Sequence, residues 1–317
     1  MQKYNPELDM LNVELLQILN SLTALGSQQW FLFALASAVI TAIIAVMEKR
    51  LLQHEHTLTF SAGHALLAFL LSLPLLFFAD FSKVTPFILV MMYFGMFAAA
   101  GAFWLTARGV KHLEMSISSP LTVVNLAFIP FLAFFFLGER LSLQQGAGIF
   151  LIFIGVVALE FFQHNSKLFR FSDLLRDKYL VLTIIGGLLY AVTAIVDKVS
   201  LSTLDPFTYL VIAHFFIAIN SLLIMAFLDH EFKKDLRQLF SQDAKTVFVV
   251  SLLSIVQRLS LAFAIQGAFV SLAVAVKKLS SLFATIMAGR LFHERHIVQK
   301  TLVSLIMIAG AALLVLS

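Results

Sequence analysis

Ten apolar segments follow one another along the chain, and short polar stretches separate them. They cover residues 30–48, 58–79, 86–107, 116–137, 143–162, 180–200, 207–228, 245–266, 269–290 and 298–316. A helix of about 20 residues crosses a hydrocarbon core about 30 Å thick, because each residue adds about 1.5 Å. The pattern therefore predicts an all-α integral membrane protein with ten transmembrane helices.

The polar stretches divide the chain. Residues 1–29 lack the basic start and continuous apolar core of a cleavable signal peptide, so we expect an interfacial N-terminal segment there. Residues 166–179 mix both charge signs and form a connecting loop between a first unit, residues 30–165, and a second unit, residues 180–317. The two units are expected to contribute five helices each.

An internal repeat supports this division. The segment "FFFLGERLSLQQGAGIFLIFIGVVALE" (134–160) matches "AGRLFHERHIVQKTLVSLIMIAGAALLVL" (288–316) when Glu139 is laid on Glu294. Likewise "AVMEKRLL" (45–52) matches "AIVDKVSL" (194–201). Because each unit holds an odd number of crossings, the second must enter the membrane from the opposite face. Inverted repeats of this kind are typical of secondary transporters.

The fourth and fifth spans also resemble a known family. The segment "LEMSISSPLTVVNLAFIPFLAFFFLGERLSLQQGAGIFLIFIGVVAL" (113–159) is similar to the EamA-type repeat of the drug/metabolite transporter superfamily, in which one helix ends in Gly-Glu and a glycine-rich helix follows. Here the motif is Gly138-Glu139, and the second copy departs to His293-Glu294. The resemblance implies ten helices and secondary transport of small metabolites.

Composition agrees with membrane insertion. Hydrophobic residues make up 60% of the chain and charged residues 13%, whereas about a quarter of a soluble domain is charged. The absence of cysteine excludes disulfides and thiolate chemistry. No Gly-rich phosphate loop is present, and the histidines of "HERH" (293–296) are three apart rather than four, so neither ATP, a metal nor another cofactor is expected and the protein is not predicted to be an enzyme.

Three cations lie deep inside predicted spans, namely Arg258, Lys277 and Lys278. Each costs at least about 2.5–3.5 kcal/mol at a helix centre. The nearest acidic residues, Glu48 and Asp197, stand toward helix ends. A bound anionic substrate is one candidate counter-charge. The alternatives are lysines that extend to the interface, or pairing with Glu48 or Asp197.

Other polar and aromatic residues in the spans are less specific. Histidines at related positions of the two units can bind substrate, carry a proton or bond a backbone carbonyl. Glu48 and Asp197 are candidates for proton or ion coupling, or else solvated helix ends beside Lys49 and Lys198. Those histidines are His64 and His214. The remaining substrate-binding candidates are Asn125, which can also hydrogen-bond across helices, and Tyr93, which can also belong to the interfacial aromatic belt.

Positive charge is distributed unevenly between the two membrane faces. The loops after odd-numbered spans carry 15 lysines and arginines, and the opposite side carries four. The positive-inside rule places the first set in the cytoplasm and both termini outside, whereas members of the family that the chain resembles commonly have both termini inside. This asymmetry accounts for the basic net charge without nucleic-acid binding, and we expect a multi-pass protein of the inner (plasma) membrane.

The leading functional hypothesis is a secondary transporter that moves a small anionic or zwitterionic metabolite by alternating access. Its partners are then the substrate, the lipid bilayer and a coupling proton or ion. Three alternatives stay open: an exporter of amino acids or amphiphilic compounds, a lipid-linked flippase, and a non-transporting membrane scaffold.

Span glycines such as Gly101, Gly155, Gly186 and Gly310 are expected at close helix contacts.

Overall fold

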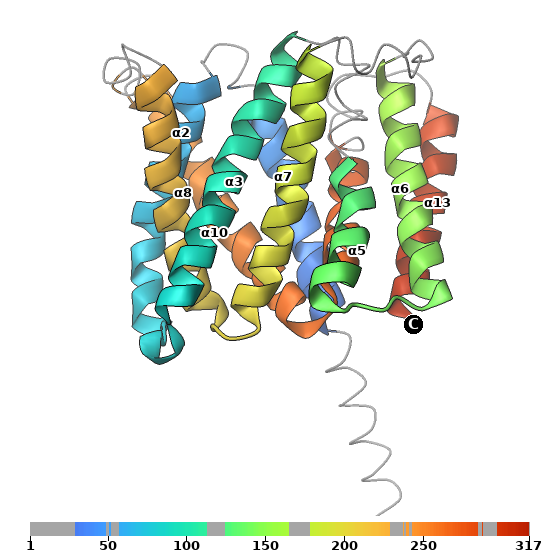
Figure 1. Ribbon diagram of the computed structural model, residues 1–317. Helices are drawn as coiled ribbons and strands as arrows, with labels where there is room; N and C mark the ends of the chain where they lie inside the picture. Colours follow the sequence, from blue (N-terminus) through green and yellow to red (C-terminus); the bar gives the residue numbers. More distant parts are fainter. Residues whose placement is uncertain are drawn as a thin grey trace, which may run out of the picture.

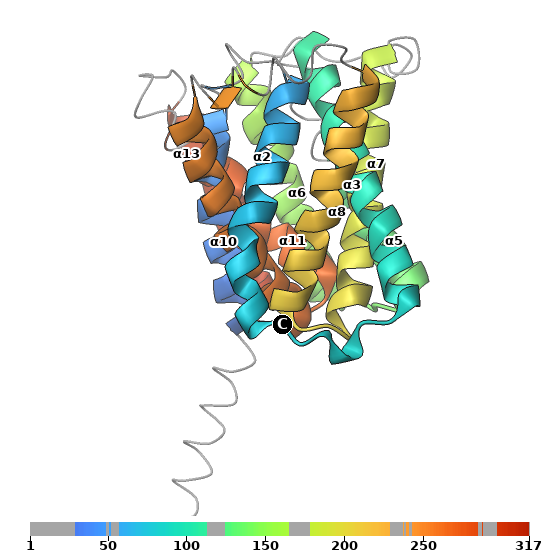
Figure 2. The same ribbon diagram turned by 90° about the vertical axis from the view of Figure 1, so that its left-hand side faces the viewer.

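The protein is a bundle of long helices, which lie side by side between two faces (Figures 1 and 2). The computed structural model describes residues 29–48, 51, 57–112, 124–164, 178–228, 237, 239–240, 243–284, 287 and 297–316. All regular structure within these ranges is helical. The expected all-α fold class is therefore confirmed.

The helices follow the predicted spans closely. A first span at Gln29–Glu48 precedes the elements α2 (Thr57–Ser72), the 3-10 turns η1 (Leu73–Phe78) and η2 (Phe81–Lys83), α3 (Pro86–His112), α5 (Val124–Leu137), α6 (Leu143–His164), α7 (Lys178–Leu201), α8 (Pro206–Leu228), α10 (Ala244–Gly267), α11 (Val270–Lys277) and α13 (Ile297–Val315). Within the described ranges, six helices are long and apolar enough to cross a membrane. Shorter apolar helices lie at Leu126–Leu137, Leu143–Ala158 and Leu305–Val315.

Matching helices of the two units run in opposite directions. The η1–η2 connection after α2 meets the start of α8, because the Asp80 amide lies 3.3 Å from the Asp205 carboxylate. Since α2 ends where α8 begins, the two helices are antiparallel. The α6 and α13 helices, which carry the two copies of the repeat, are also antiparallel (Figure 1). The inverted arrangement is thus confirmed. Glu294, which aligns with Glu139, lies outside the described residues.

Small residues allow the helices to approach closely. A Cβ on Gly310 of α13 would lie 2.8 Å from the Gly148 carbonyl oxygen of α6, and a Cβ on Gly155 would lie 2.2 Å from Met307. On α7, a Cβ on Gly186 would lie 2.6 Å from Thr106 of α3. These three positions confirm the expected close contacts. Gly101 differs, because its Cβ would meet Leu189 at an ordinary 3.9 Å.

The ninth predicted span is interrupted. It was expected as one helix over residues 269–290, but α11 ends at Lys277. The Lys278 amide is shared between the carbonyls of Val274 and Ala275, and the Leu279 amide then bonds Val276, three residues back. This tightening is typical of 3-10 geometry. The two adjacent lysines therefore stand at a break in the helix.

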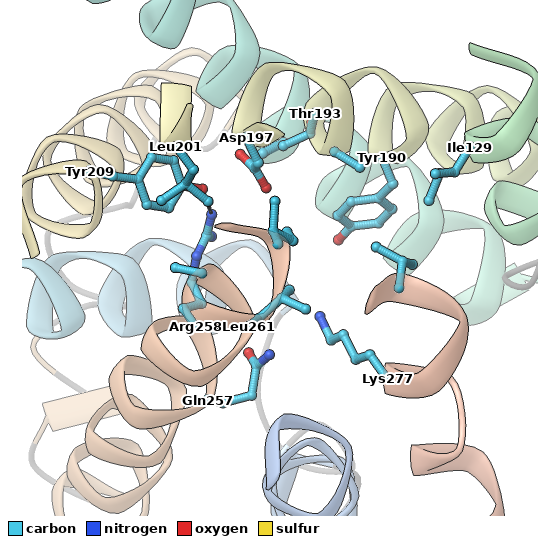
Figure 3. A pocket seen from close by; sticks show the side chains of 15 residues that line it. Ile129, Tyr190, Thr193, Asp197, Leu201, Tyr209, Gln257, Arg258, Leu261 and Lys277 are labelled. Carbon is cyan, nitrogen blue, oxygen red and sulfur yellow. Dashed lines mark hydrogen bonds between the residues drawn. The ribbon is translucent and has the colours of Figure 1, made fainter. Parts of the chain in front are cut away.

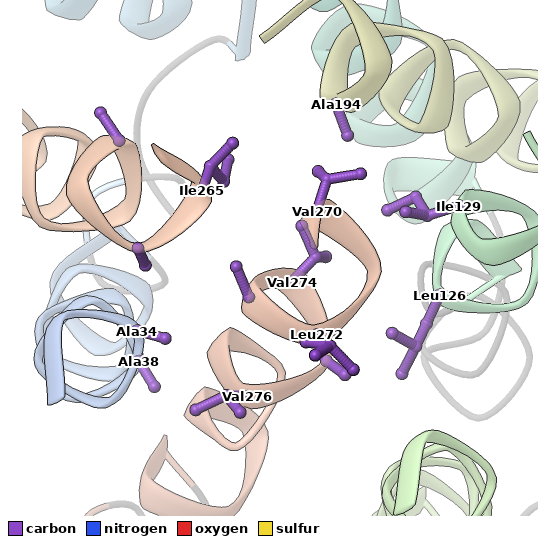
Figure 4. Close-up of a cluster of buried hydrophobic side chains, with 14 of the residues drawn as sticks. Ala34, Ala38, Leu126, Ile129, Ala194, Ile265, Val270, Leu272, Val274 and Val276 are labelled. Carbon is purple, nitrogen blue, oxygen red and sulfur yellow. The ribbon is translucent and has the colours of Figure 1, made fainter. Parts of the chain in front are cut away.

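The short helix α11 lies at the centre of the bundle. All residues from Val270 to Val276 are buried. Side chains of α11 pack against Leu126 and Ile129 of α5, Ala194 of α7 and Ile265 of α10 (Figure 4). A helix that is apolar on every side is stable only when other helices surround it. This surrounding apolar shell fixes the position of Lys277 at the end of α11.

Candidate functional site

A central cavity of about 180 Å³ lies between the two repeats (Figure 3). Helices α3 and α5 of the first unit and α7, α8, α10 and α11 of the second contribute to its wall. The lining residues are Ala99, Ile129, Tyr190, Thr193, Ala194, Asp197, Leu201, Tyr209, Gln257, Arg258, Leu261, Ala262, Ile265, Val274 and Lys277. Eight of the fifteen lining residues are apolar, and the other seven carry polar or charged side chains.

Two of the three predicted cations line the cavity. Arg258 reaches it from α10 and Lys277 from the end of α11 (Figure 3). Lys278 is not among the lining residues. Consecutive residues of a helical turn point about 100° apart, so the two lysines face different directions. The cavity wall therefore includes one guanidinium and one ammonium group.

Asp197 enters the same cavity from α7. It is only 8% exposed, and its Oδ1 accepts no hydrogen bond from the described residues. The Arg258 Nη2 donates to the Tyr209 hydroxyl at 3.4 Å, and Tyr209 also faces Asp197 (Figure 3). The solvated helix end considered for Asp197 is therefore wrong, because α7 continues to Leu201 and buries this residue. The cavity holds two cationic side chains and one carboxylate.

Four uncharged polar residues of the wall were not predicted, namely Tyr190, Thr193, Tyr209 and Gln257. The Tyr190 and Gln257 side chains face the cavity with Tyr209 (Figure 3). The Gln257 Nε2 donates to the Ser37 Oγ of the first span at 2.7 Å, which ties α10 to that span. A signal for Tyr190 was present in the sequence: it precedes Asp197 by seven residues, which places both on one helix face.

The two histidines lie outside the cavity wall. The His64 Nδ1 lies 3.0 Å from the Ser251 Oγ of α10, and its ring stacks on Phe60 with 5.6 Å between centroids. His214 is 3% exposed, and its Nδ1 has no hydrogen-bond partner among the described residues. Neither ring lines the central cavity. Neither histidine therefore shares the cavity wall with Arg258 and Lys277.

The remaining candidates do not join the site. Tyr93 packs edge-on against Phe94 and Phe216, each with 5.5 Å between ring centroids. Glu48, at the end of the first span, is not in the cavity wall. The side chain of Asn125 lies outside the described residues. Of the nine predicted site residues, the cavity wall therefore contains Arg258, Lys277 and Asp197.

Two charged side chains hold the turn between α10 and α11. The Lys198 Nζ donates to the carbonyls of Ile265 and Ala268, each at 2.7 Å. The Glu139 Oε1 accepts from the Val270 amide at 2.7 Å, and its Oε2 accepts from the Ser271 hydroxyl at 2.8 Å. Backbone carbonyls at the end of α10 therefore bind the Lys198 ammonium.

Asp205 caps the start of α8, outside the membrane-spanning segments. The Asp205 Oδ1 accepts from the amides of Phe207 and Thr208 at 2.9 and 3.0 Å. Burial alone would raise the pKa of Asp205, but hydrogen bonds from Thr208, the Asp80 amide and the Phe207 amide outweigh it and hold that pKa below its ordinary value of 3.8. This capping fixes the start of α8, which carries Tyr209 to the cavity.

Two inverted helical repeats around a central polar cavity define the class of the molecule, a multi-pass integral membrane transporter. The chain belongs to the EamA-like transporter family, whose profile matches residues 28–161 and 177–316. One solved structure, described only as a crystal structure of a protein, is 11% identical, covers 91% of this chain and 96% of its own, and has a TM-score of 0.66. That likeness concerns the fold alone. No curated protein matches the chain.

Proposed function

We propose that the protein is a secondary transporter that binds the anionic group of a small anionic or zwitterionic metabolite in the central cavity. The observation that carries this proposal is the convergence of Arg258 and Lys277 on one cavity between the repeats (Figure 3). Two cations are expensive at membrane depth, and a carboxylate or phosphate of the substrate would offset that cost.

The presence of Asp197 extends the proposal to zwitterions. A substrate ammonium group would find a carboxylate oxygen that has no hydrogen-bond partner among the described residues. In the absence of such a group, Asp197 is the internal counter-charge of Arg258 and Lys277. Of the two coupling candidates, Asp197 is therefore preferred over Glu48, because a proton bound to Asp197 would directly change the affinity of the cavity for an anion.

The size of the cavity favours a small substrate. Its volume of about 180 Å³ is below the roughly 300–1,000 Å³ of pockets for drug-sized ligands. A polar cavity between repeats also favours transport over a scaffold that moves nothing. We propose alternating access as the mechanism, since the cavity wall draws on both repeats and relative movement of the repeats would open it to one face at a time.

We propose a division of the chain that follows the two repeats. Residues 1–29 form an N-terminal interfacial segment, residues 30–165 and 180–317 form the repeats, and residues 166–179 connect them. Segment 1–29 lies outside the described residues except for Gln29, and segment 166–179 is described only at Lys178 and Tyr179. The partners proposed are a small-molecule substrate, the bilayer and a coupling proton or ion.

A ligand screen by thermal stabilisation tests the anion site. Small carboxylates, phosphates and amino acids are added to purified protein, since a ligand of the folded state stabilises it by RT ln(1 + [L]/Kd). Loss of a buried charge-assisted contact should weaken the affinity of an active compound by at least about tenfold in R258A and K277A. The exposed Lys83 of η2 supplies the control variant K83A, which should respond as the wild type does. Equal responses of all four proteins would rule out the anion site.

A further inference from the structure

The turn between α10 and α11 separates the central cavity from a second hollow. This hollow, here called the vestibule, has a volume of about 690 Å³ and lies beside the C-terminal end of α13. Its lining residues are Trp30, Gln145, Lys198, Gln266, Gly267, Ala268, Phe269, Leu272, Leu314, Val315 and Leu316. Consecutive residues lie on opposite sides of the partition, because Ile265 lines the central cavity and Gln266 lines the vestibule.

The turn is held from both of its ends. The last carbonyls of a helix and its first amides have no partners within the helix, so they need partners elsewhere. At the end of α10, the ammonium of Lys198 binds the carbonyls of Ile265 and Ala268. At the start of α11, the carboxylate of Glu139 binds the amide of Val270 and the hydroxyl of Ser271.

The local chain geometry directs Glu139 to α11. Gly138 has a φ of 68°, a left-handed conformation that glycine adopts without the cost of a Cβ. The Glu139 amide then donates to the Ala133 carbonyl at 3.2 Å, which closes the last turn of α5. The chain reverses here, and the Glu139 side chain is left 5% exposed against Val270 and Ser271. The Gly-Glu dipeptide therefore both ends α5 and supplies the contact.

The contact joins the two repeats. Glu139 belongs to the first repeat, whereas α11 and Lys198 belong to the second. If the repeats move apart on this side, the bonds between Glu139 and α11 must break, and the turn loses one of its two supports. The bonds are charge-assisted and buried, so they favour the closed arrangement.

We propose that Glu139 and Lys198 are gating residues, which hold the α10–α11 turn closed between the vestibule and the central cavity. The substrate passes between these two spaces when the Glu139 contacts break. This inference rests on the proposed transport function, because a gate has meaning only where a substrate crosses. Glu139 and Lys198 act by positioning the turn, and they do not bind the substrate in the central cavity.

The natural absence of cysteine allows a direct test. I265C places one thiol in the central cavity, and Q266C places one in the vestibule. A charged, membrane-impermeant maleimide is added to the side of the membrane from which Q266C reacts, and the labelling rate of I265C from that side is measured. In the otherwise unchanged protein, Q266C should react quickly and I265C slowly.

The gating variants should change only the labelling rate of I265C. In E139Q the amide replaces one carboxylate oxygen by a donor, which cannot accept from Val270 or Ser271. We expect I265C to react about tenfold faster in E139Q and in K198M, with Q266C unchanged. R140Q, which alters the exposed neighbour of Glu139, is the matched control and should leave both rates as they are.

One further variant keeps the test decisive. S271A removes one contact and should give a smaller increase, which supplies a result even if E139Q fails to fold. If E139Q, K198M and S271A all fold and leave I265C labelling unchanged, the gate assignment is wrong. The assay needs no substrate, so it is separate from the ligand screen: faster labelling with an unaffected ligand response in R258A and K277A would reject the anion site and retain the gate.

Discussion

Two adjacent residues of α7 have different roles because a helix turns by about 100° per residue. Asp197 faces the central cavity, while Lys198 reaches the carbonyls of Ile265 and Ala268. A charged pair near the end of an apolar run is usually a solvated helix end. Here both residues are instead part of the packed molecule, Asp197 at the proposed anion site and Lys198 at the turn that closes it.

Neutralising Asp197 should strengthen the binding of a simple anion. In D197N the cavity keeps Arg258 and Lys277 but loses the carboxylate that competes with a substrate anion. The repulsion between Asp197 and a bound anion is worth on the order of 1–2 kcal/mol, so the affinity for a monoanion should rise by about five- to thirtyfold. Calorimetric titration of an active anion into both proteins measures the change. Unchanged or weaker anion binding in D197N would contradict this electrostatic role.

Removing the cap of α8 should lower stability in a pH-dependent way. D205A loses the bonds to the Phe207 and Thr208 amides, and loss of such a cap costs about 0.5–2 kcal/mol. Because the folded pKa of Asp205 lies below its ordinary 3.8, its contribution is present above about pH 4 and is lost as the pH falls through the lower folded value. Thermal unfolding midpoints of both proteins should therefore differ at pH 7 and converge below pH 4. A constant difference across that range would contradict the role of the ionised carboxylate.

At the level of helices, the pattern of apolar residues predicts where a helix lies better than it predicts where a helix is interrupted. The spans expected at 207–228 and 245–266 correspond to Pro206–Leu228 and Ala244–Gly267, because burial in lipid decides where such helices begin and end. The break of α11 at Lys277 was not predictable in this way. It depends on backbone amides that change acceptors, and the side chains of residues 269–290 give no proline or glycine signal inside the break.

The same distinction applies to the site. Arg258 and Lys277 could be identified because charge in an apolar helix is costly, whatever the tertiary arrangement. Tyr190 could be inferred only from the helix face that it shares with Asp197. Tyr209 could not be identified, since tyrosine is also common at membrane interfaces and its role depends on which helices meet. Their place in the cavity wall follows from the packing of α7 and α8 around α10.

Two glycines of α6 should respond very differently to the same substitution. A Cβ on Gly148 would lie 2.6 Å from Leu314 and 2.9 Å from the Gly310 carbonyl oxygen, whereas a Cβ on Gly146 would meet nothing within 4 Å. G148A should therefore destabilise the α6–α13 contact by about 1–3 kcal/mol. G146A is the control, and it should be neutral or slightly stabilising because alanine favours the helix by up to about 1 kcal/mol. Thermal unfolding of both variants gives the comparison, and equal midpoints would show that this contact can relax.

For the whole molecule, the inverted repeat makes the two faces alike in architecture and leaves charge to distinguish them. The face that holds the C-terminus also holds the η2 turn, the α5–α6 connection and the α7–α8 connection (Figure 1). Its few cations include Lys83 and Arg140, and Lys198 is already bound to backbone carbonyls. The loops of the opposite face carry 15 lysines and arginines. We therefore expect loop charge, rather than the fold, to set the orientation in the membrane.

This asymmetry predicts the side of the C-terminus. Because lysine- and arginine-rich loops are retained in the cytoplasm, the 15-cation face should be cytoplasmic and Ser317 should lie outside. Alkaline phosphatase fused after Ser317 should then be active, because it folds only outside the cytoplasm, and a fluorescent protein fused there should stay dark. The same two reporters inserted in the loop 229–243 should give the reverse result. An inactive phosphatase with a bright fluorescent fusion at Ser317 would show that the membrane orientation follows the arrangement common in the family, and it would place the vestibule on the cytoplasmic side of the gate.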